Sequence, residues 1–414
     1  MKVKNLIVGM EFNRNESRVC YYENSEQDAV SAEVRVGSDR SSFPTLLCRM
    51  PDSGNWHFGL EAEYFIRQKN GTAVEKLYDL CRDGSSLELD GQKYEADELL
   101  AVFLEQSLTL LGVKDIGAQV DGLMLTVPSL SRSFVRTIRK AFARLDLAPG
   151  RARLQDFRES FYYHTLYQRQ ELWGRQVALF CFEEDAVSFS RLVLNAGARP
   201  VTARVLEGER AELPLSALER DAEFRKMAER CLGDEIFSSV FLVGQTFNRS
   251  WAKTSIQTLC RKQRKVFSEN NLFAKGACYA IREKVDQRVL KGYMYLGNDM
   301  VTYDLGMELL INGTEAYVPL ASAGMNWYEA GRTCEILLDG SKNLEFLVTR
   351  MQDGIRRRYS MELVDLPERP AKASRVRLQA EFDAPDRCRI RVEDLGFGEL
   401  FPTSGKVWQE VLEG

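Results

Sequence analysis

The chain has 414 residues and a formal net charge of −4; 44% of its residues are apolar and 28% are charged. This length exceeds what one hydrophobic core organises, so two or three domains are expected. The negative balance argues against broad nucleic-acid binding and against docking on an anionic membrane, and no apolar run approaches the roughly 20 residues that span a bilayer.

The cysteines and histidines predict neither disulfides nor a metal site. The nine cysteines occur singly, without a Cys-x-x-Cys pair, and residues 1–4 run into a strand without the small-residue cleavage site of a secretory signal. We therefore expect reduced thiols and a cytoplasmic protein. The two histidines, His57 and His164, are too isolated to predict a histidine-based metal site.

Residues 1–175 alternate predicted strands with predicted helices. An apolar strand from Leu6 contains one glycine, Gly9, and leads through a tight turn to a second strand at Val19–Tyr22. A buried strand is predicted at Leu123–Val127, ended by Pro128. Apolar residues recur at helical spacing in two stretches: Leu100, Phe103, Leu104, Leu108 and Leu111, then Phe134, Ile138, Ala141, Phe142 and Leu145. The alternation predicts an α/β sheet covered on its faces.

Residues 176–289 repeat this opening pattern. A strand at Val177–Phe182 leads through a turn to a second strand at Val187–Val193. The block closes with a strand at Val240–Val243 and a helix that ends near Lys284. We expect a second α/β block, followed by a linker at Val289–Asn298.

Residues 290–414 show a period of two. Asn312-Gly313 and Asp339-Gly340 each separate two short apolar runs, and such dipeptides favour type I′ hairpin turns. Alternation is clearest at Val376, Leu378, Ala380 and Phe382, and again at Cys388, Ile390 and Val392. The pattern predicts an antiparallel β domain with one buried face.

Short motifs in collinear order resemble those of one known family. They are Ser42-Phe43-Pro44-Thr45, Phe58-Gly59-Leu60-Glu61-Ala62, Leu125-Thr126-Val127-Pro128, Leu242-Val243-Gly244-Gln245 and Lys275-Gly276-Ala277. Their order and spacing resemble the 70-kDa heat-shock protein (chaperone) family of the actin-like ATPase superfamily. The resemblance implies an α/β fold: a two-lobed actin-like ATPase with ribonuclease H-like lobes, followed by an antiparallel β-sandwich. Lobe I would be residues 1–175, a reduced lobe II 176–289, and a substrate-binding-like sandwich without its helical lid 290–414.

The positions that match the family's first phosphate loop depart from its pattern. Glu11 stands for an aspartate, Asn13 for a glycine and Arg14 for a threonine. Bulky side chains keep backbone N–H groups away from a phosphate. Arg14 could still meet an anion electrostatically, although a solvated turn arginine is the simpler interpretation.

The second loop departs further. Glu183, Glu184 and Asp185 replace three glycines, and Gln245 follows Gly244 where the adenosine-side turn has a second glycine. Like charges about 4 Å apart cost about 4 kcal/mol at an effective dielectric of about 20. Mg²⁺ could in principle bridge carboxylates and phosphate. We interpret these eight residues of the two loops and the adenosine-side turn as a vestigial nucleotide cleft.

The resemblance and these departures together predict a non-catalytic, chaperone-like protein, a pseudo-ATPase without catalytic residues. It would bind a protein or peptide partner through the C-terminal β domain, and would need no ATP, Mg²⁺ or other cofactor. Two alternatives stay open: a divergent ATP-dependent chaperone that hydrolyses ATP with Mg²⁺, and a sugar or acetate-type kinase on the same superfamily fold. Neither nucleic acid nor a membrane is an expected partner.

Other residues offer weaker candidates. His57 is expected at the surface and His164 as a packing residue in a helix. The basic run Arg261–Lys265 is predicted as a solvated helix face, with phosphate or RNA contact as the alternative. Arg356–Arg358 is expected to open a strand whose charges protect a sheet edge. The aromatic cluster Phe161, Tyr162, Tyr163, Tyr167 and Trp173 is expected to fill space between the lobes, with a ligand pocket as the alternative.

Overall fold

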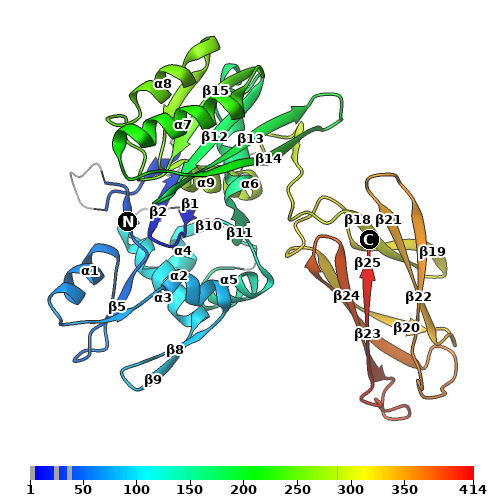
Figure 1. Ribbon diagram of the computed structural model, residues 1–414. Coiled ribbons are helices and arrows are strands. Elements are labelled where there is room, and N and C mark those ends of the chain that lie inside the picture. The colour runs from blue at the N-terminus through cyan, green and yellow to red at the C-terminus, as the bar shows by residue number, and fades with distance from the viewer. Residues whose placement is uncertain (1–4, 23–27, 35–39, 149, 287) are drawn as a thin grey trace. The chain divides into compact units, whose positions relative to one another are not determined.

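The structure is a computed structural model that describes residues 5–22, 28–34, 40–148, 150–286 and 288–414. It divides into two compact units, Met1–Tyr295 and Leu296–Gly414 (Figure 1). The division lies six residues beyond the boundary expected between residues 289 and 290, because a short strand, β17 (Tyr293–Tyr295), joins a sheet of the first unit. Within the described residues, no helix has the length and apolar character needed to cross a membrane.

The first half of unit 1 mixes strands and helices as predicted. Its elements are β1 Leu6–Glu11, β2 Glu16–Tyr22, β3 Val30–Ser31, β4 Ser42–Pro44, β5 Leu47–Arg49, β6 Trp56–Phe58, α1 Gly59–Arg67, β7 Thr72–Val74, α2 Leu77–Asp83, β8 Ser86–Leu89, β9 Gln92–Glu95, α3 Ala96–Leu108, α4 Ile116–Gln119, β10 Val120–Val127, α5 Arg132–Arg144, β11 Ala152–Asp156 and α6 Phe157–Leu166. Local chemistry sets the helix starts. The Ser131 side chain accepts a bond from the Phe134 N–H at the start of α5, and Asp156 does the same for Glu159 in α6.

The second half has fewer elements. They are β12 Gln176–Phe182, β13 Ala186–Asn195, β14 Val201–Glu212, α7 Ala217–Leu232, β15 Phe237–Val243, α8 Lys253–Leu259, β16 Lys265–Ser268, α9 Leu272–Val285 and β17. The helix predicted at the basic run is reduced to a distorted 3-10 turn, Arg261–Gln263. Lys262 has a left-handed φ of 56°, which ends the helical geometry, and Lys265 already begins β16.

The two halves repeat one sheet design. The first sheet has the strand order β11-β10-β1-β2-β3, with β4 also paired to β2, and the second has the order β16-β15-β12-β13-β14-β17. In each, the first strand of the opening hairpin runs antiparallel to the second and parallel to a later strand. A further parallel strand follows on the same side, and a helix, α6 or α9, comes directly after it.

Helices α6 and α9 lie against each other between the two sheets (Figure 1). Gly276 permits this approach, and Gly9 permits α9 to pack closely on β1. A Cβ added to Gly9 in β1 would lie 2.2 Å from the backbone nitrogen of Cys278, and one added to Gly276 would lie 2.0 Å from the carbonyl oxygen of Ser160. Both distances are far below van der Waals contact. The glycine of the first strand therefore serves helix packing, because α9 presses directly on its backbone.

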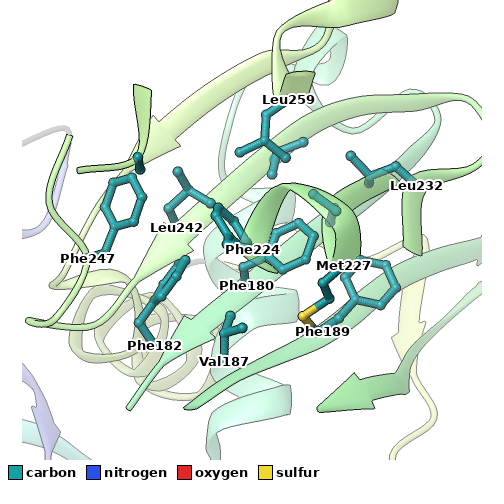
Figure 2. Close-up of a cluster of buried hydrophobic side chains, with 14 of the residues drawn as sticks. Phe180, Phe182, Val187, Phe189, Phe224, Met227, Leu232, Leu242, Phe247 and Leu259 are labelled. Carbon is teal, nitrogen blue, oxygen red and sulfur yellow. The ribbon is translucent and has the colours of Figure 1, made fainter. Parts of the chain in front are cut away.

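A buried cluster anchors the second half (Figure 2). Helix α7 places Phe224 and Met227 on the sheet, where the Phe224 ring meets Phe180 at 5.2 Å and Phe182 at 4.8 Å between centroids. Phe182 is the last residue of β12 and also packs on Phe247 at 4.9 Å. The residue that precedes the turn after β12 is therefore anchored in the core by its side chain.

Unit 2 is an antiparallel strand domain, as predicted. Its strands are β18 Tyr303–Ile311, β19 Thr314–Ala321, β20 Gly331–Leu338, β21 Asn343–Arg350, β22 Arg356–Glu362, β23 Ser374–Ala384, β24 Arg387–Gly396 and β25 Val407–Glu413. They form two four-stranded sheets, β19-β18-β21-β22 and β20-β23-β24-β25. Tyr303 of the first sheet lies 5.6 Å from Phe382 of the second, measured between ring centroids. The alternating residues of β23 and β24 are buried, which confirms the predicted apolar face.

The two hairpin predictions in this unit have opposite outcomes. Asn312 and Gly313 both have positive φ and join β18 to β19, which confirms a two-residue type I′ turn. The hairpin at Asp339-Gly340 is wrong, because β20 pairs with β23 whereas β21 pairs with β18 and β22. Only Gly340 of that dipeptide has a positive φ. The residues after Gly405, where the family would place its helical lid, form strand β25.

Candidate functional site

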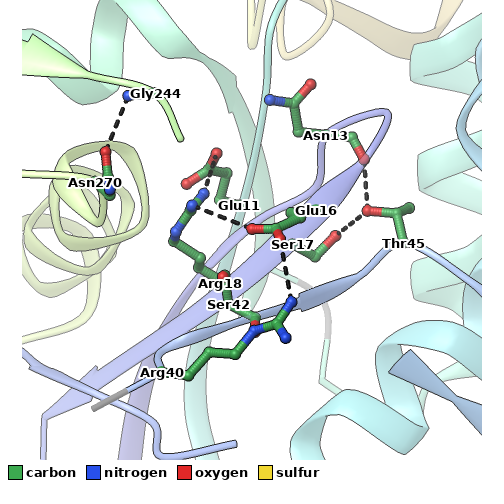
Figure 3. Close-up of polar contacts among 10 residues, drawn as sticks. All are labelled: Glu11, Asn13, Glu16, Ser17, Arg18, Arg40, Ser42, Thr45, Gly244 and Asn270. Atoms are coloured by element: carbon green, nitrogen blue, oxygen red, sulfur yellow. Dashed lines mark hydrogen bonds and ion pairs between the residues drawn. The ribbon is translucent and has the colours of Figure 1, made fainter. Parts of the chain in front are cut away.

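The first turn, residues 12–15, follows a buried ion pair. Glu11 ends β1 and lies directly opposite Arg18 in β2. The Arg18 Nη1 atom is 3.2 Å from Glu11 Oε1, and both side chains are less than a tenth exposed (Figure 3). Burial raises the pKa of Glu11 above its ordinary value, although the charge of Arg18 and the bonds to Arg18 and Asn13 oppose the shift. The site thus holds a carboxylate that depends on one internal cation.

Other residues close the first turn from the side. Arg18 also lies 3.5 Å from Glu16, which Arg40 approaches at 3.3 Å. The Thr45 hydroxyl donates to the Asn13 carbonyl oxygen at 2.6 Å (Figure 3). The Asn13 side chain accepts a hydrogen bond from the backbone N–H of the next residue, so its amide stabilises the turn itself.

Arg14 is directed to a different partner. Its guanidinium lies 2.8 Å from Asp79 at the start of α2 and 6.0 Å from the centre of the Tyr78 ring. More than half of its side chain is exposed. This geometry is that of a solvated arginine with a surface ion pair.

The second turn, residues 183–185, joins β12 to β13. Arg210 of β14 donates two hydrogen bonds to the Glu183 carboxylate, at 3.0 and 2.6 Å. The side chains of Glu184 and Asp185 are exposed, and within the described residues neither has an ion-pair partner. Three backbone carbonyls of the turn are occupied: the Thr246 hydroxyl binds that of Glu183, the Arg220 guanidinium that of Glu184, and the Leu213 N–H that of Asp185.

Gly244 crosses directly over the second turn. Its φ is 122°, and a Cβ at this position would lie 2.1 Å from the Phe182 carbonyl oxygen. Its N–H donates to the Asn270 side chain at 3.0 Å (Figure 3). Gln245, the next residue, is exposed. Glycine is required here by the approach of two strand ends, whatever else the turn does.

Acidic residues of both hairpins influence the pKa of one buried thiol, that of Cys181. Cys181, near the end of β12, has its pKa raised to about 12 by burial and by the negative charges of Glu11 and Glu183. Glu11 belongs to the first hairpin and Glu183 to the second, so both hairpins contribute negative charge near this thiol. Among the described residues, no group of three or more His, Cys, Asp or Glu side chains is arranged to hold a metal ion.

Sequence reasoning identified the acids of this site and missed their counterions. Arg18, Arg40 and Arg210 each hold a carboxylate of the two hairpins. An alternation of charge across the first hairpin could have suggested Arg18, since Glu11 and Arg18 are equidistant from the turn. Arg210 gave no local signal, because it comes 27 residues after its partner.

The remaining candidates are structural. His164 is fully buried, with its Nε2 atom 3.3 Å from Glu269, as expected of a packing residue. Tyr167, the residue that follows α6, stacks on Tyr279 of α9 at 4.4 Å between centroids, which supports packing between the two halves. The Nδ1 atom of His57, in β6, lies 3.1 Å from Glu61 in the first turn of α1. Arg356–Arg358 opens β22, an edge strand, as predicted.

The comparisons with known proteins cover nearly all of both units. A model described as "Family of unknown function (DUF5716) C-terminal" matches residues 28–298. A second, described as "Domain of unknown function (DUF8552)", matches residues 300–413. A search of curated proteins gave no match.

Proposed function

We propose that this chain, which belongs to the family of unknown function DUF5716, is a non-catalytic relative of the actin-like chaperone ATPases that acts by binding a protein or peptide partner. The observation that carries the proposal is that acidic side chains, each paired with an arginine, occupy both hairpins. Where a nucleotide site would need small residues and open N–H groups, Arg18 and Arg210 hold carboxylates in place. Phosphoryl transfer relies on positioning and on neutralising negative charge, and these turns supply the opposite charge pattern.

The duplicated sheet supports the choice of superfamily. Both halves open with an antiparallel hairpin, add parallel strands on one side and continue into helices that pack together. That arrangement fits two ribonuclease H-like lobes with the active cleft at their hairpin turns. In the second half, only β14 and α7 lie between β13 and β15, which fits a reduced lobe II.

The electrostatics of the two turns supports the proposal that no triphosphate binds here. Glu184 and Asp185 would each add a repulsion on the order of 4 kcal/mol to a phosphate about 4 Å away, at an effective dielectric of about 20. Arg210 neutralises Glu183, and Arg18 is shared between Glu11 and Glu16. Arg14, the cation of the first turn, pairs with Asp79, so the cations at this site are already engaged by carboxylates.

Unit 2 offers the surface for a partner. A groove of about 750 Å³ lies at one end of the strand domain, lined by residues 371–373, 375 and 397–401. Leu400 is 88% exposed and Phe397 46% exposed. The loop that carries them is held by Asp394, which accepts two bonds from Arg369, at 2.8 and 2.9 Å, and one from the Ser404 N–H. Apolar side chains on a rigid loop lose little entropy on binding.

Calorimetric titration with Mg-ATP tests the non-catalytic assignment. We expect no binding heat at millimolar ATP. Micromolar affinity, or ATP hydrolysis that substitutions of Glu183 to Asp185 abolish, would instead establish the divergent ATPase alternative.

A second experiment tests the partner surface. We expect Leu400→Asp to abolish a crosslink to a reproducible protein partner in the native cell. Leu215→Asp is the matched control, since Leu215 is 92% exposed but lies in unit 1. Equal loss in both variants, or in neither, would contradict binding through unit 2.

A further inference from the structure

One helix of unit 1 carries a continuous cationic face. The sequence of α5 contains five basic residues and no acidic one: Arg132, Arg136, Arg139, Lys140 and Arg144. All five are exposed, whereas Phe134, Ile138 and Phe142 on the opposite face are buried. Each of the longer helices α1, α3, α6, α7 and α9 includes at least one Asp or Glu. We call the exposed face the α5 stripe.

The α5 stripe is only partly neutralised. At its C-terminal end, Arg144 lies 2.8 Å from Asp97 and 3.1 Å from Glu98, and Lys140 is 4.0 Å from Asp97. Within the part of the chain that the structure describes, Arg136 and Arg139 have neither an ion pair nor a side-chain hydrogen bond. The uncompensated charge is therefore concentrated in the middle of the stripe.

This arrangement works against helix stability. Basic residues three or four apart on a helix repel one another, and Arg132 stands in the first turn, where the helix dipole disfavours a positive charge. Packing of the apolar face holds the helix in place regardless. A face that is unfavourable for folding and whose central arginines, Arg136 and Arg139, lack an intramolecular counterion among the described residues is well suited to an external anion.

We propose that the α5 stripe is a binding surface for an acidic segment of a partner protein. The residues from Arg132 to Arg144 extend about 18 Å along the helix, and four of the cations recur at every fourth position, about 6 Å apart: Arg132, Arg136, Lys140 and Arg144. Carboxylates on successive turns of a helix, or on alternate residues of an extended chain, have nearly the same spacing. Arginine suits carboxylates because its planar guanidinium donates two parallel hydrogen bonds to one carboxylate. This surface is separate from the groove of unit 2 and does not depend on its function.

Other polyanions fit less well. Binding to single-stranded nucleic acid uses exposed aromatic rings for base stacking, but the exposed positions of α5 hold only Arg, Lys, Ser and Ala. A membrane-surface helix inserts an apolar face, whereas the apolar face of α5 is buried in the protein core. The net charge of −4 also repels any polyanion that extends beyond the stripe.

Fluorescence anisotropy with the whole chain tests the proposal. The probe is a labelled glutamate-rich peptide of about 16 residues, long enough to cover the stripe. We expect binding that weakens as salt is raised, and at least about a tenfold loss of affinity in the double variant R136E/R139E. Both side chains are exposed and unpartnered, so this variant should keep the circular dichroism of the original protein.

A matched variant and two other probes make the test decisive. R249E/K253E changes the net charge equally at exposed positions of the second half, and should alter peptide affinity less than about twofold. Equal losses in the two variants, or no peptide binding at low salt, would overturn the proposal. So would tighter binding of single-stranded RNA or of phosphatidylserine vesicles that R136E/R139E abolishes, which would assign the stripe to nucleic acid or to a membrane.

Discussion

The substitution Arg18→Met should destabilise unit 1 strongly and in a pH-dependent way. It removes the only cation within bonding distance of Glu11 among the described residues, and the Glu11 side chain is 3% exposed. A buried carboxylate without a counterion is costly, typically about 3–5 kcal/mol. Methionine keeps the apolar stem of arginine, so little of the loss comes from packing.

Protonation of Glu11 limits the cost of this substitution. The ordinary pKa of the carboxyl is 4.5, so protonating it at pH 7 costs about 3.4 kcal/mol, from about 1.36 kcal/mol per pH unit. At pH 5 the same step costs only about 0.7 kcal/mol. A raised acid pKa gives stability that is complete below pH 4.5 and is lost as the pH rises through the folded-state pKa. We therefore expect Arg18→Met to cost about 3–4 kcal/mol at pH 7 and about 1 kcal/mol at pH 5.

Urea unfolding at both pH values, followed by far-UV circular dichroism, measures these differences. Arg40→Met is the matched control, because Arg40 is 46% exposed and its pair with Glu16 should contribute less than about 1 kcal/mol. The double variant Arg18→Met with Glu11→Gln should recover about 1–2 kcal/mol at pH 7, since it leaves no buried charge. A cost below about 1 kcal/mol at pH 7, or equal costs at the two pH values, would show that Glu11 is solvated and that the first turn is open.

Three further predictions concern the packing of α9, the loop of unit 2 and the α5 stripe. Gly9→Ala should cost about 3 kcal/mol or more in urea unfolding, because its Cβ would lie 2.2 Å from the Cys278 nitrogen. The control Gly292→Ala, whose Cβ would have no atom within 4 Å, should change the free energy of unfolding by less than about 1 kcal/mol. Similar costs for the two substitutions would refute the packing role of Gly9. The Arg369 guanidinium holds the pKa of Asp394 well below its usual range, so this contribution is present above about pH 4 and is lost as the pH falls further. Asp394→Asn should then cost about 3 kcal/mol at pH 7 in the unfolding of unit 2 and less in strong acid; a cost independent of pH would contradict the ion pair. Arg136→Glu should stabilise unit 1 by about 0.5–1 kcal/mol, measured as a higher thermal midpoint, because it removes repulsion along the stripe; destabilisation would mean that Arg136 has a structural role.

Features with a local cause were predictable. The hairpin at Asn312-Gly313 depends on two residues that tolerate positive φ, and β23 depends on a period of two. The opening hairpins of both halves follow in the same way from short apolar runs around a turn. The prediction at Asp339-Gly340 failed because the same dipeptide also suits a connection between two sheets.

The sequence by itself determined the α/β blocks, the antiparallel character of unit 2 and the acidic nature of the second turn. Only the tertiary structure decided that helix α9 packs on Gly9, with Cys278 following it by 269 positions. It also decided that Arg18 pairs with Glu11, that Arg210 pairs with Glu183, and that the cations of α5 are exposed. The physical reason is the distance along the chain over which each interaction acts. Backbone preference and burial period act over a few residues, whereas the neighbour of a glycine or of a charge comes from distant segments that only the complete fold brings together.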